Sequence, residues 1–249
     1  MTRFFRQIRQ RLLANNKFSK YLLYAVGEII LVVIGILIAI QLNSKEIERE
    51  NNRQLTNIYK SIKEDLQFDT LRISNIIRFY ESKDSILSEV LSDTFLLKRF
   101  DTINEENYED CRFCRSSVTN FAIFSVSKNG YLRLNEFSVK STEELDSLSL
   151  QLIQWYRETI PDVEGRGQAV RNLARGNHDF LEQFPWYLDY IERRYNEESV
   201  NFFTKDPMYR NKVATYKTMA TNNYLRRLYY HKDEIFEALN LVDQRLGIE

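Results

Sequence analysis

Residues 21–42 read YLLYAVGEIILVVIGILIAIQL, and this stretch sets the organisation of the whole chain. It contains one charged side chain, Glu28. A helix of this length rises ~33 Å at 1.5 Å per residue, enough to cross a hydrocarbon core of about 30 Å. The apolar run of a signal peptide is shorter, about 7–15 residues, and no cleavage site of small residues follows Ala39. The stretch therefore predicts a retained transmembrane helix over residues 21–42.

Residues 1–20 form a basic flank that has no acidic side chain. By the positive-inside rule, its charges predict that the flank stays in the cytoplasm and that residues 43–249 are exported. The six basic residues are Arg3, Arg6, Arg9, Arg11, Lys17 and Lys20. Apolar residues recur at helical spacing on the other face, beginning with Phe4 and Phe5, so we expect a cytoplasmic amphipathic arm that lies on anionic membrane lipid. A plain topology signal would explain the charges but would leave the two phenylalanines without a role.

Three residues of the predicted span share one face of the helix. At 100° per residue, Gly35 and Ala39 each lie within about 20° of Glu28, on either side of it. Gly35 and Ala39 form a small-xxx-small pair, which lets a partner helix approach closely. A carboxyl group on the same face would avoid lipid by facing that partner, although Glu28 alone could equally reach the cytoplasmic headgroups. The coincidence of the three favours a helix–helix interface, most simply in a homo-oligomer.

The composition excludes several classes of protein. An apolar share of 43% and an aromatic share of 13% are too high for a disordered chain. The 35 basic residues balance 35 acidic ones, which argues against a nucleic-acid binder. Two cysteines and two histidines leave little for metal or triad chemistry, and neither a glycine-rich phosphate loop nor a nucleophile elbow occurs. We therefore expect no enzyme activity, no catalytic residues, no cofactor and no metal.

A helical stripe of apolar residues covers 45–100, a range without glycine or proline. The steps between the positions of the stripe are mostly three or four, with gaps of seven between Leu66 and Ile73 and between Tyr80 and Leu87. We expect a long helix whose weakest point is 82–85 (SKDS), where two helices could meet. The polar residues 101–120 predict a connection with room for a short helix.

The middle of the chain contains stop and start signals. Asn129-Gly130 is typical of a helix end, and the following residues 131–140 (YLRLNEFSVK) are expected to be extended. A capping box at 141–144 (STEE) predicts the start of a helix, and Pro161 predicts its end.

The C-terminal part is predicted to be helical throughout. Two helices fit 163–183 and 186–198, and Asp206-Pro207 combines an N-cap with a proline at the first helical position. The whole pattern predicts an all-α fold, in which the N-terminal transmembrane helix is followed by an elongated antiparallel helical bundle over 43–249. The last helix carries a stripe formed by Val213, Tyr216, Ala220, Leu225, Leu228, Ile235, Leu239, Val242 and Leu246.

Cys111 and Cys114 form a CxxC pair. The βαβ setting of a thioredoxin-type redox site and the further ligands of a zinc site are missing. In an exported, oxidising compartment we expect a local disulfide, because positions i and i+3 on a helical turn place their Cα atoms within bridging range.

Aromatic residues gather in two later stretches and could line a groove for a glycan or a peptide. They are Trp155, Tyr156, Trp186, Tyr187 and Tyr190. Burial in the core is the more common fate of such residues. Residues 176–179 (GNHD) resemble one metal-ligand block of metallophosphoesterases, but the other blocks are absent, so we interpret them as a turn or cap within the bundle.

Residues 4–43 (FFRQIRQRLLANNKFSKYLLYAVGEIILVVIGILIAIQLN) resemble the N-terminal signature of an uncharacterised family of bacterial single-pass membrane proteins. The motifs are FFRxIR at Phe4–Arg9, NKxSKY at Asn16–Tyr21 and GEIxLVVIGILIAxQ at Gly27–Gln41. The resemblance implies a protein of the bacterial inner membrane with a helical periplasmic domain, and it brings no assigned activity.

These observations lead to two functional expectations. The first is an interaction or scaffold protein, or an accessory subunit, that forms homo-oligomers or docks another envelope protein. The alternative is a periplasmic ligand-binding sensor or co-receptor that signals through a partner, with its groove between Trp155 and Trp186.

Overall fold

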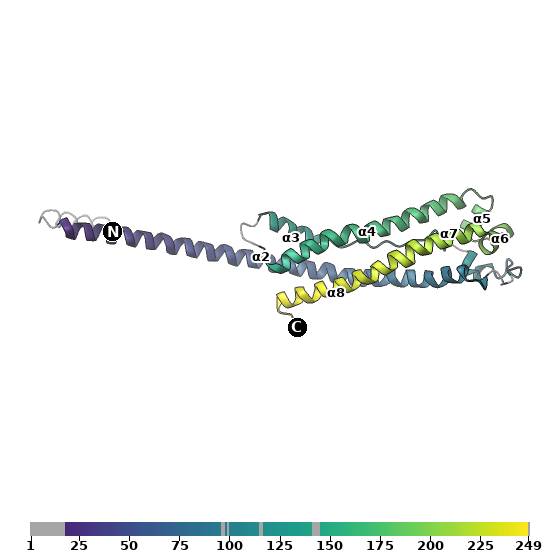
Figure 1. Ribbon diagram of the computed structural model, residues 1–249, viewed down its shortest axis with the longest axis horizontal. Coiled ribbons are helices and arrows are strands. Elements are labelled where there is room, and N and C mark those ends of the chain that lie inside the picture. The colour runs from purple at the N-terminus through teal and green to yellow at the C-terminus, as the bar shows by residue number, and fades with distance from the viewer. Residues whose placement is uncertain (1–17, 96–97, 99, 115–116, 141–144, 249) are drawn as a thin grey trace. The chain divides into compact units, whose positions relative to one another are not determined.

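The described part of the chain contains helices and no strand, which confirms the predicted all-α class (Figure 1). The chain divides into two compact units, Met1–Thr56 and Asn57–Glu249. Most of the predicted arm lies outside the described residues. The computed structural model describes residues 18–95, 98, 100–114, 117–140 and 145–248.

The first helix, α2, spans Phe18–Leu91 and includes the whole predicted membrane segment. It passes through 82–85 without a break, so the expected long helix continues across its predicted weakest point and no junction of two helices forms there. Lys83 explains this continuity, because it is buried and its Nζ donates to the carbonyl oxygen of Ser117 at 2.6 Å. A tertiary contact therefore holds a turn that local propensity leaves weak.

Three long helical runs form the bundle of the second unit (Figure 1). The part of α2 from residue 57 and the C-terminal run are antiparallel. Lys63 Nζ lies 2.7 Å from Asp243 Oδ1, whereas at the other end Arg210 Nη2 donates to the Leu91 carbonyl oxygen at 3.0 Å. This arrangement confirms the predicted antiparallel bundle. The other two runs are α4 (Ser147–Leu181) and the C-terminal run of α7 (Pro207–Lys217), a π-helix η4 (Thr218–Leu225) and α8 (Arg226–Leu246).

A short helix, α3 (Asn129–Lys140), begins where the sequence predicts a helix to stop and a segment to be extended. Both predictions are wrong, because Asp65 of α2 caps the new helix. Its carboxylate accepts from the Gly130 backbone N–H at 2.7 Å and from Asn129 Nδ2 at 3.3 Å. Glycine is needed at position 130, since an added Cβ would lie 2.5 Å from Ile62 Cγ1.

Helix α4 continues through Pro161, so the predicted end there is wrong. Pro161 is exposed, whereas Thr159 and Val163 beside it are buried, so core packing holds both sides of the proline in one helix. Asp146 is the N-cap of the helix, and its Oδ1 accepts from the Ser149 backbone N–H at 2.9 Å. The predicted capping box at 141–144 lies outside the described residues.

The predicted helix over 186–198 is also wrong, because two short helices, α5 (Tyr187–Glu192) and α6 (Glu197–Lys205), occupy this region. Arg193 adopts a left-handed backbone with φ of 57° and ends α5. The start signal at Asp206-Pro207 is confirmed, since Asp206 Oδ1 accepts from the Met208 backbone N–H at 2.7 Å. The connection between α2 and α3 contains the 3₁₀ turns η2 (Tyr108–Asp110) and η3 (Arg112–Cys114).

The π-helix follows from the spacing of the buried residues. Tyr216, Ala220, Tyr224 and Leu228 are all fully buried and lie four residues apart. Three such steps would drift by about 120° around an α-helix with 100° per residue. The wider turn of a π-helix cancels that drift and keeps the four side chains on the core side.

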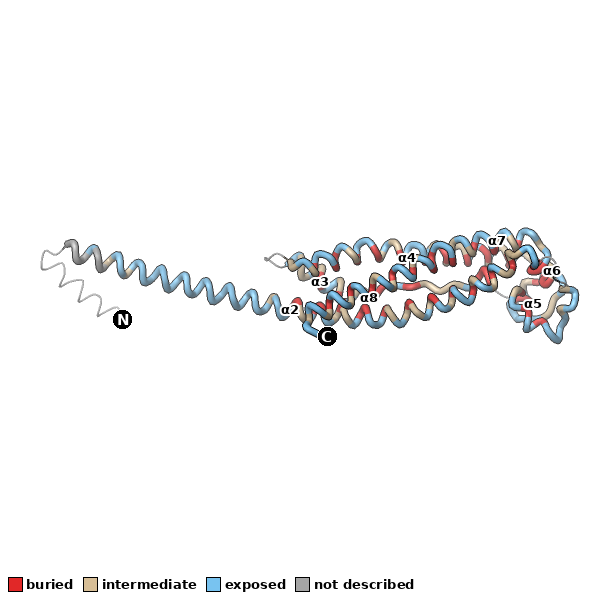
Figure 2. Tube along the Cα trace, turned by 60° about the horizontal axis from the view of Figure 1, so that its bottom comes forward, coloured by how far each residue is buried: buried red, intermediate tan, exposed pale blue. Residues whose placement is uncertain are grey.

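Residues 117–128, which we call the threaded segment, have no helix or strand and run between the long helices (Figure 2). Buried irregular backbone needs hydrogen-bond partners, and side chains of the surrounding helices supply them. The Tyr80 hydroxyl donates to the Ala122 carbonyl oxygen at 2.8 Å, and the Phe124 N–H donates to the Tyr224 hydroxyl at 2.8 Å. Burial raises the pKa of Tyr80 to about 12, so its hydroxyl stays protonated and can donate.

Candidate functional site

The apolar segment of α2, residues 22–42, is the most unusual surface of the molecule. Its large apolar side chains are 47–73% exposed wherever they are described, with Leu31 the most exposed. Figure 2 shows this part of α2 exposed along most of its length. Within the described residues, α2 is the one helix long and apolar enough to cross a membrane.

The three residues of the predicted helix–helix interface lie in this segment. Gly35 and Ala39 are exposed, and Glu28 is partly buried. A Cβ added at Gly35 would meet nothing within 4 Å, and the same holds for Gly27. The packing of this chain therefore does not require either glycine.

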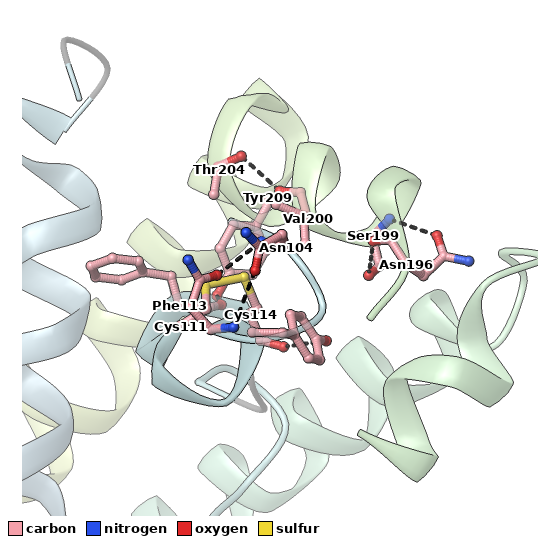
Figure 3. The surroundings of a disulfide bond; sticks show 11 residues. Asn104, Cys111, Phe113, Cys114, Asn196, Ser199, Val200, Thr204 and Tyr209 are labelled. Atoms are coloured by element: carbon pink, nitrogen blue, oxygen red, sulfur yellow. Dashed lines mark hydrogen bonds between the residues drawn. A yellow bond between two sulfur atoms is a disulfide. The ribbon is translucent and has the colours of Figure 1, made fainter. Parts of the chain in front are cut away.

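Cys111 and Cys114 are joined by a disulfide in the connection between α2 and α3, with their Cα atoms 5.3 Å apart (Figure 3). Both are buried. The Tyr209 hydroxyl of α7 donates to the Phe113 carbonyl oxygen at 3.3 Å, and the Phe113 ring centroid lies 5.0 Å from that of Phe95. The turn is thus attached both to α7 and to the segment that follows α2.

The aromatic residues predicted to form a groove belong to two different clusters. Trp155 stacks on His231 with ring centroids 5.7 Å apart, and Tyr156 stacks on Tyr131 at 4.9 Å. Trp186 packs instead against Phe202 and other rings of α5 and α6. From Tyr156 to Leu181, the end of α4, the chain rises ~37 Å, so the structure does not bring Trp155 and Trp186 together.

The two remaining predicted groove residues, Tyr187 and Tyr190, lie in the second cluster, which contains Trp186. Tyr187 bonds to His178, with its hydroxyl 2.8 Å from Nδ1 of the imidazole. Tyr190 is buried and lines a pocket of about 240 Å³ whose other lining residues include His178 and Arg193.

The GNHD residues 176–179 lie within the last turns of α4, so the predicted turn or cap there is wrong. Asn177 is buried, and its Nδ2 donates to the Val118 carbonyl oxygen of the threaded segment at 3.0 Å. No group of three or more His, Cys, Asp or Glu side chains in the described part of the chain is placed to hold a metal ion. In the structure these residues anchor the threaded segment.

Sequence reasoning missed the buried carboxylates of α2. Asp69 is 1% exposed and accepts from the backbone N–H and the hydroxyl of Ser127, at 2.8 and 2.7 Å. Burial raises its pKa, and the two hydrogen bonds oppose that shift. The signal was present, because Asp69 fills the seven-residue gap in the apolar stripe between Leu66 and Ile73.

The fold and the exposed segment together define an all-α protein whose described part contains one helix suited to crossing a membrane. Residues 28–148 of the chain match a family described as "Family of unknown function (DUF6090)". The match begins in the apolar segment and ends in the first turn of α4, so it includes the disulfide and the threaded segment. No curated protein and no solved structure matches the chain.

Proposed function

We propose that the chain is a single-pass protein of the bacterial inner membrane, with a cytoplasmic N-terminus and a periplasmic helical domain, and that it acts as an interaction or scaffold subunit. The exposure of the apolar segment 22–42 carries this proposal. Transfer of each large apolar side chain out of water is favourable by about 1.5–3 kcal/mol of free energy. We therefore expect this surface to be covered by lipid or by protein. Apart from Glu28 and Gln41, the segment is apolar on all sides, which is typical of a helix surrounded by lipid.

The assembly part of the proposal rests on Gly35 and Ala39. Neither small residue is required by the chain's own packing, and both share a face with Glu28. A second copy of the helix would be able to approach closely at this face, and the carboxyl group of Glu28 would then lie against protein instead of lipid. Another envelope protein could use the same face or the bundle.

The anchor and its orientation are tested together. Inner-membrane vesicles are washed at alkaline pH, and intact spheroplasts are treated with a protease added outside. We expect the chain to stay with the vesicles and the protease to digest the bundle. Release of the intact chain by the wash, or a fully protected bundle, would overturn the proposal.

The assembly is tested with two glycine variants of the same helix. Gly35→Leu places a large side chain on the proposed face, whereas Gly27→Leu places it about 80° around the helix and is the matched control. We expect cross-linking of copies in mild detergent to fall for Gly35→Leu and to persist for Gly27→Leu. Equal cross-linking of both variants would contradict the interface.

The alternative, a ligand-binding sensor or co-receptor, is favoured by the pocket beside Tyr190. The ring centroid of Trp186 lies 6.3 Å from that of Tyr190, so a ligand in this pocket would change tryptophan emission. Small periplasmic metabolites are therefore screened by fluorescence, with Trp186→Phe as the control that should lose the response. No change with any of them would leave the scaffold function as the better account.

A further inference from the structure

The π-helix carries a group of polar side chains that the scaffold function does not use. Asn222 and Asn223 are exposed on it, and they follow Thr221, so three poor helix formers occur in a row. π-Helical turns are rare and often mark functional sites. Asn222 makes no side-chain hydrogen bond with any described residue, so stabilising the turn does not explain its amide.

A pocket of about 450 Å³ opens beside this turn, between α4 and the C-terminal run. Its lining contains three arginines and no acidic residue. One arginine comes from α4 and two from the first turn of α8. The lining residues are Arg166, Thr218, Asn222, Asn223, Arg226, Arg227 and Tyr230.

Two of the arginines have a structural role. Arg166 Nε lies 2.7 Å from Asp162 Oδ1, and Arg227 Nε lies 2.5 Å from Asp162 Oδ2. Arg227 also bonds to Glu234 at 3.1 Å, yet its Nη1 is buried without a hydrogen-bond partner among the described residues. These pairs join α4 to α8, and they leave one donor of Arg227 unused.

Arg226 has no such role. Within the described residues it forms no ion pair, and it bonds only to Tyr230, with Nη2 3.2 Å from the hydroxyl and the guanidinium 5.7 Å from the ring centroid. The local count is three guanidinium groups, Arg166, Arg226 and Arg227, against two carboxylates. The pocket therefore has a surplus positive charge next to an aromatic ring and unused amide donors.

We propose that this pocket binds a small oxyanion, a carboxylate or phosphate group, which Arg226 contacts through two guanidinium N–H groups while Asn222 and Arg227 donate further hydrogen bonds. Planar guanidinium groups bind such oxygens in pairs, and these charge-assisted bonds are among the stronger ones in proteins. The proposal depends on the bundle alone and does not depend on the membrane anchor or on assembly.

The test uses the full chain in nanodiscs of phosphatidylcholine. Inorganic phosphate and succinate are titrated separately by calorimetry at constant ionic strength, on the wild type, on Arg226→Ala and on Arg157→Ala. Arg157 is an exposed arginine of α4 outside the pocket, so it is the matched control for loss of one positive charge. Circular dichroism checks that each variant keeps its helicity.

We expect saturable 1:1 binding of at least one anion, weakened on the order of tenfold or more by Arg226→Ala and unchanged by Arg157→Ala. Asn222→Leu, which fills the pocket without a change of charge, should weaken binding as well. Absence of saturable binding by both anions, or equal affinity of the wild type and Arg226→Ala, would overturn the proposal.

A second arm identifies the source of the anion. The titration is repeated in nanodiscs that contain anionic phosphatidylglycerol. If the lipid competes with the soluble anion, the pocket binds a headgroup. If the affinity is unchanged, the pocket binds a free metabolite. Either result supports the site, provided that it depends on Arg226.

Discussion

The two units place polar and apolar residues in opposite positions. In the first, the large apolar side chains of 22–42 are exposed and the glycines face open space. In the second, Asp69 and His231 are buried, and an added Cβ at Gly130 or Gly167 would clash with its neighbours. Contacts within the chain thus account for the buried polar residues and the glycines of the bundle. They do not account for the apolar residues of 22–42, so the sequence of that segment reflects surroundings outside the chain.

The largest expected effect tests that contrast in the apolar segment. Leu31→Lys combined with Ile34→Lys should raise the free energy of membrane insertion by about 5–7 kcal/mol, because each lysine near the centre of a span costs about 2.5–3.5 kcal/mol. We expect alkaline washing to release the variant, or the cell to degrade it. The control, Ile47→Lys with Asn51→Lys, should stay with the vesicles. If the first variant also stays, lipid is not what covers this segment.

A glycine substitution measures the same contrast inside the bundle. Gly130→Ala should lower the free energy of unfolding by about 3 kcal/mol, because the new Cβ would lie 2.6 Å from the Ile62 backbone nitrogen, which cannot move aside cheaply. Gly165→Ala in α4 is the control, since a Cβ there meets nothing within 4 Å. It should be neutral or slightly stabilising. Urea unfolding in detergent distinguishes the two, and equal stabilities would contradict the described packing.

The threaded segment gives an intermediate effect. Tyr224→Phe removes the hydroxyl that accepts from the buried Phe124 N–H, which should lower the free energy of unfolding by about 1–3 kcal/mol. Hydrogen exchange at the Phe124 amide should accelerate in parallel. Tyr131→Phe is the control, because the Tyr131 hydroxyl has no hydrogen-bond partner in the described residues. Unchanged exchange at Phe124 would show that the segment is held in another way.

The smallest expected effect is on the loss of stability at acidic pH. Partial burial opposes ionisation of Asp146, but hydrogen bonds from Tyr59 and Ser149 outweigh it and lower its pKa below the ordinary 3.8. Because the folded pKa is the lower one, the stabilisation is complete above that ordinary value and is lost as the pH falls through the folded pKa.

Asp146→Asn should therefore reduce the loss of melting temperature between about pH 5 and about pH 3. The buried Asp69 acts in the opposite direction because its pKa is raised, so only the difference between the variant and the wild type reports on Asp146. If the melting temperature of the variant falls by as much as that of the wild type, the Asp146 carboxylate does not contribute to the acid dependence of stability.

Local signals predicted the elements that local contacts determine. The Asp206-Pro207 start depends on capping within a few residues, and the helical course of α2 on either side of 82–85 depends on its periodicity, so both were predictable. The start of α3 was not, because its cap, Asp65, comes from 64 residues earlier in the chain. Pro161 misled for the same reason, since packing around it decided the outcome. When another helix supplies the cap, the sequence around the start of the capped helix contains no capping signal.

The candidate sites follow the same rule. Glu28, Gly35 and Ala39 lie on one helix, so their shared face can be read from spacing alone. The arginine pocket combines α4 with a turn some 60 residues later, and only the fold brings Arg166 near Arg226. The π-helix beside it did leave a signal, namely three successive four-residue steps from Tyr216 to Leu228.

The threaded segment also has a consequence for biogenesis. Two of the tyrosines that hold it, Tyr216 and Tyr224, are synthesised 96 and 100 residues after their partners in it, Asn120 and Phe124. Until those residues leave the ribosome and dock, residues 117–128 have unpaired backbone groups and are open to proteases. A chain truncated before Tyr216 should therefore be cleaved within residues 117–128 more readily than the intact chain.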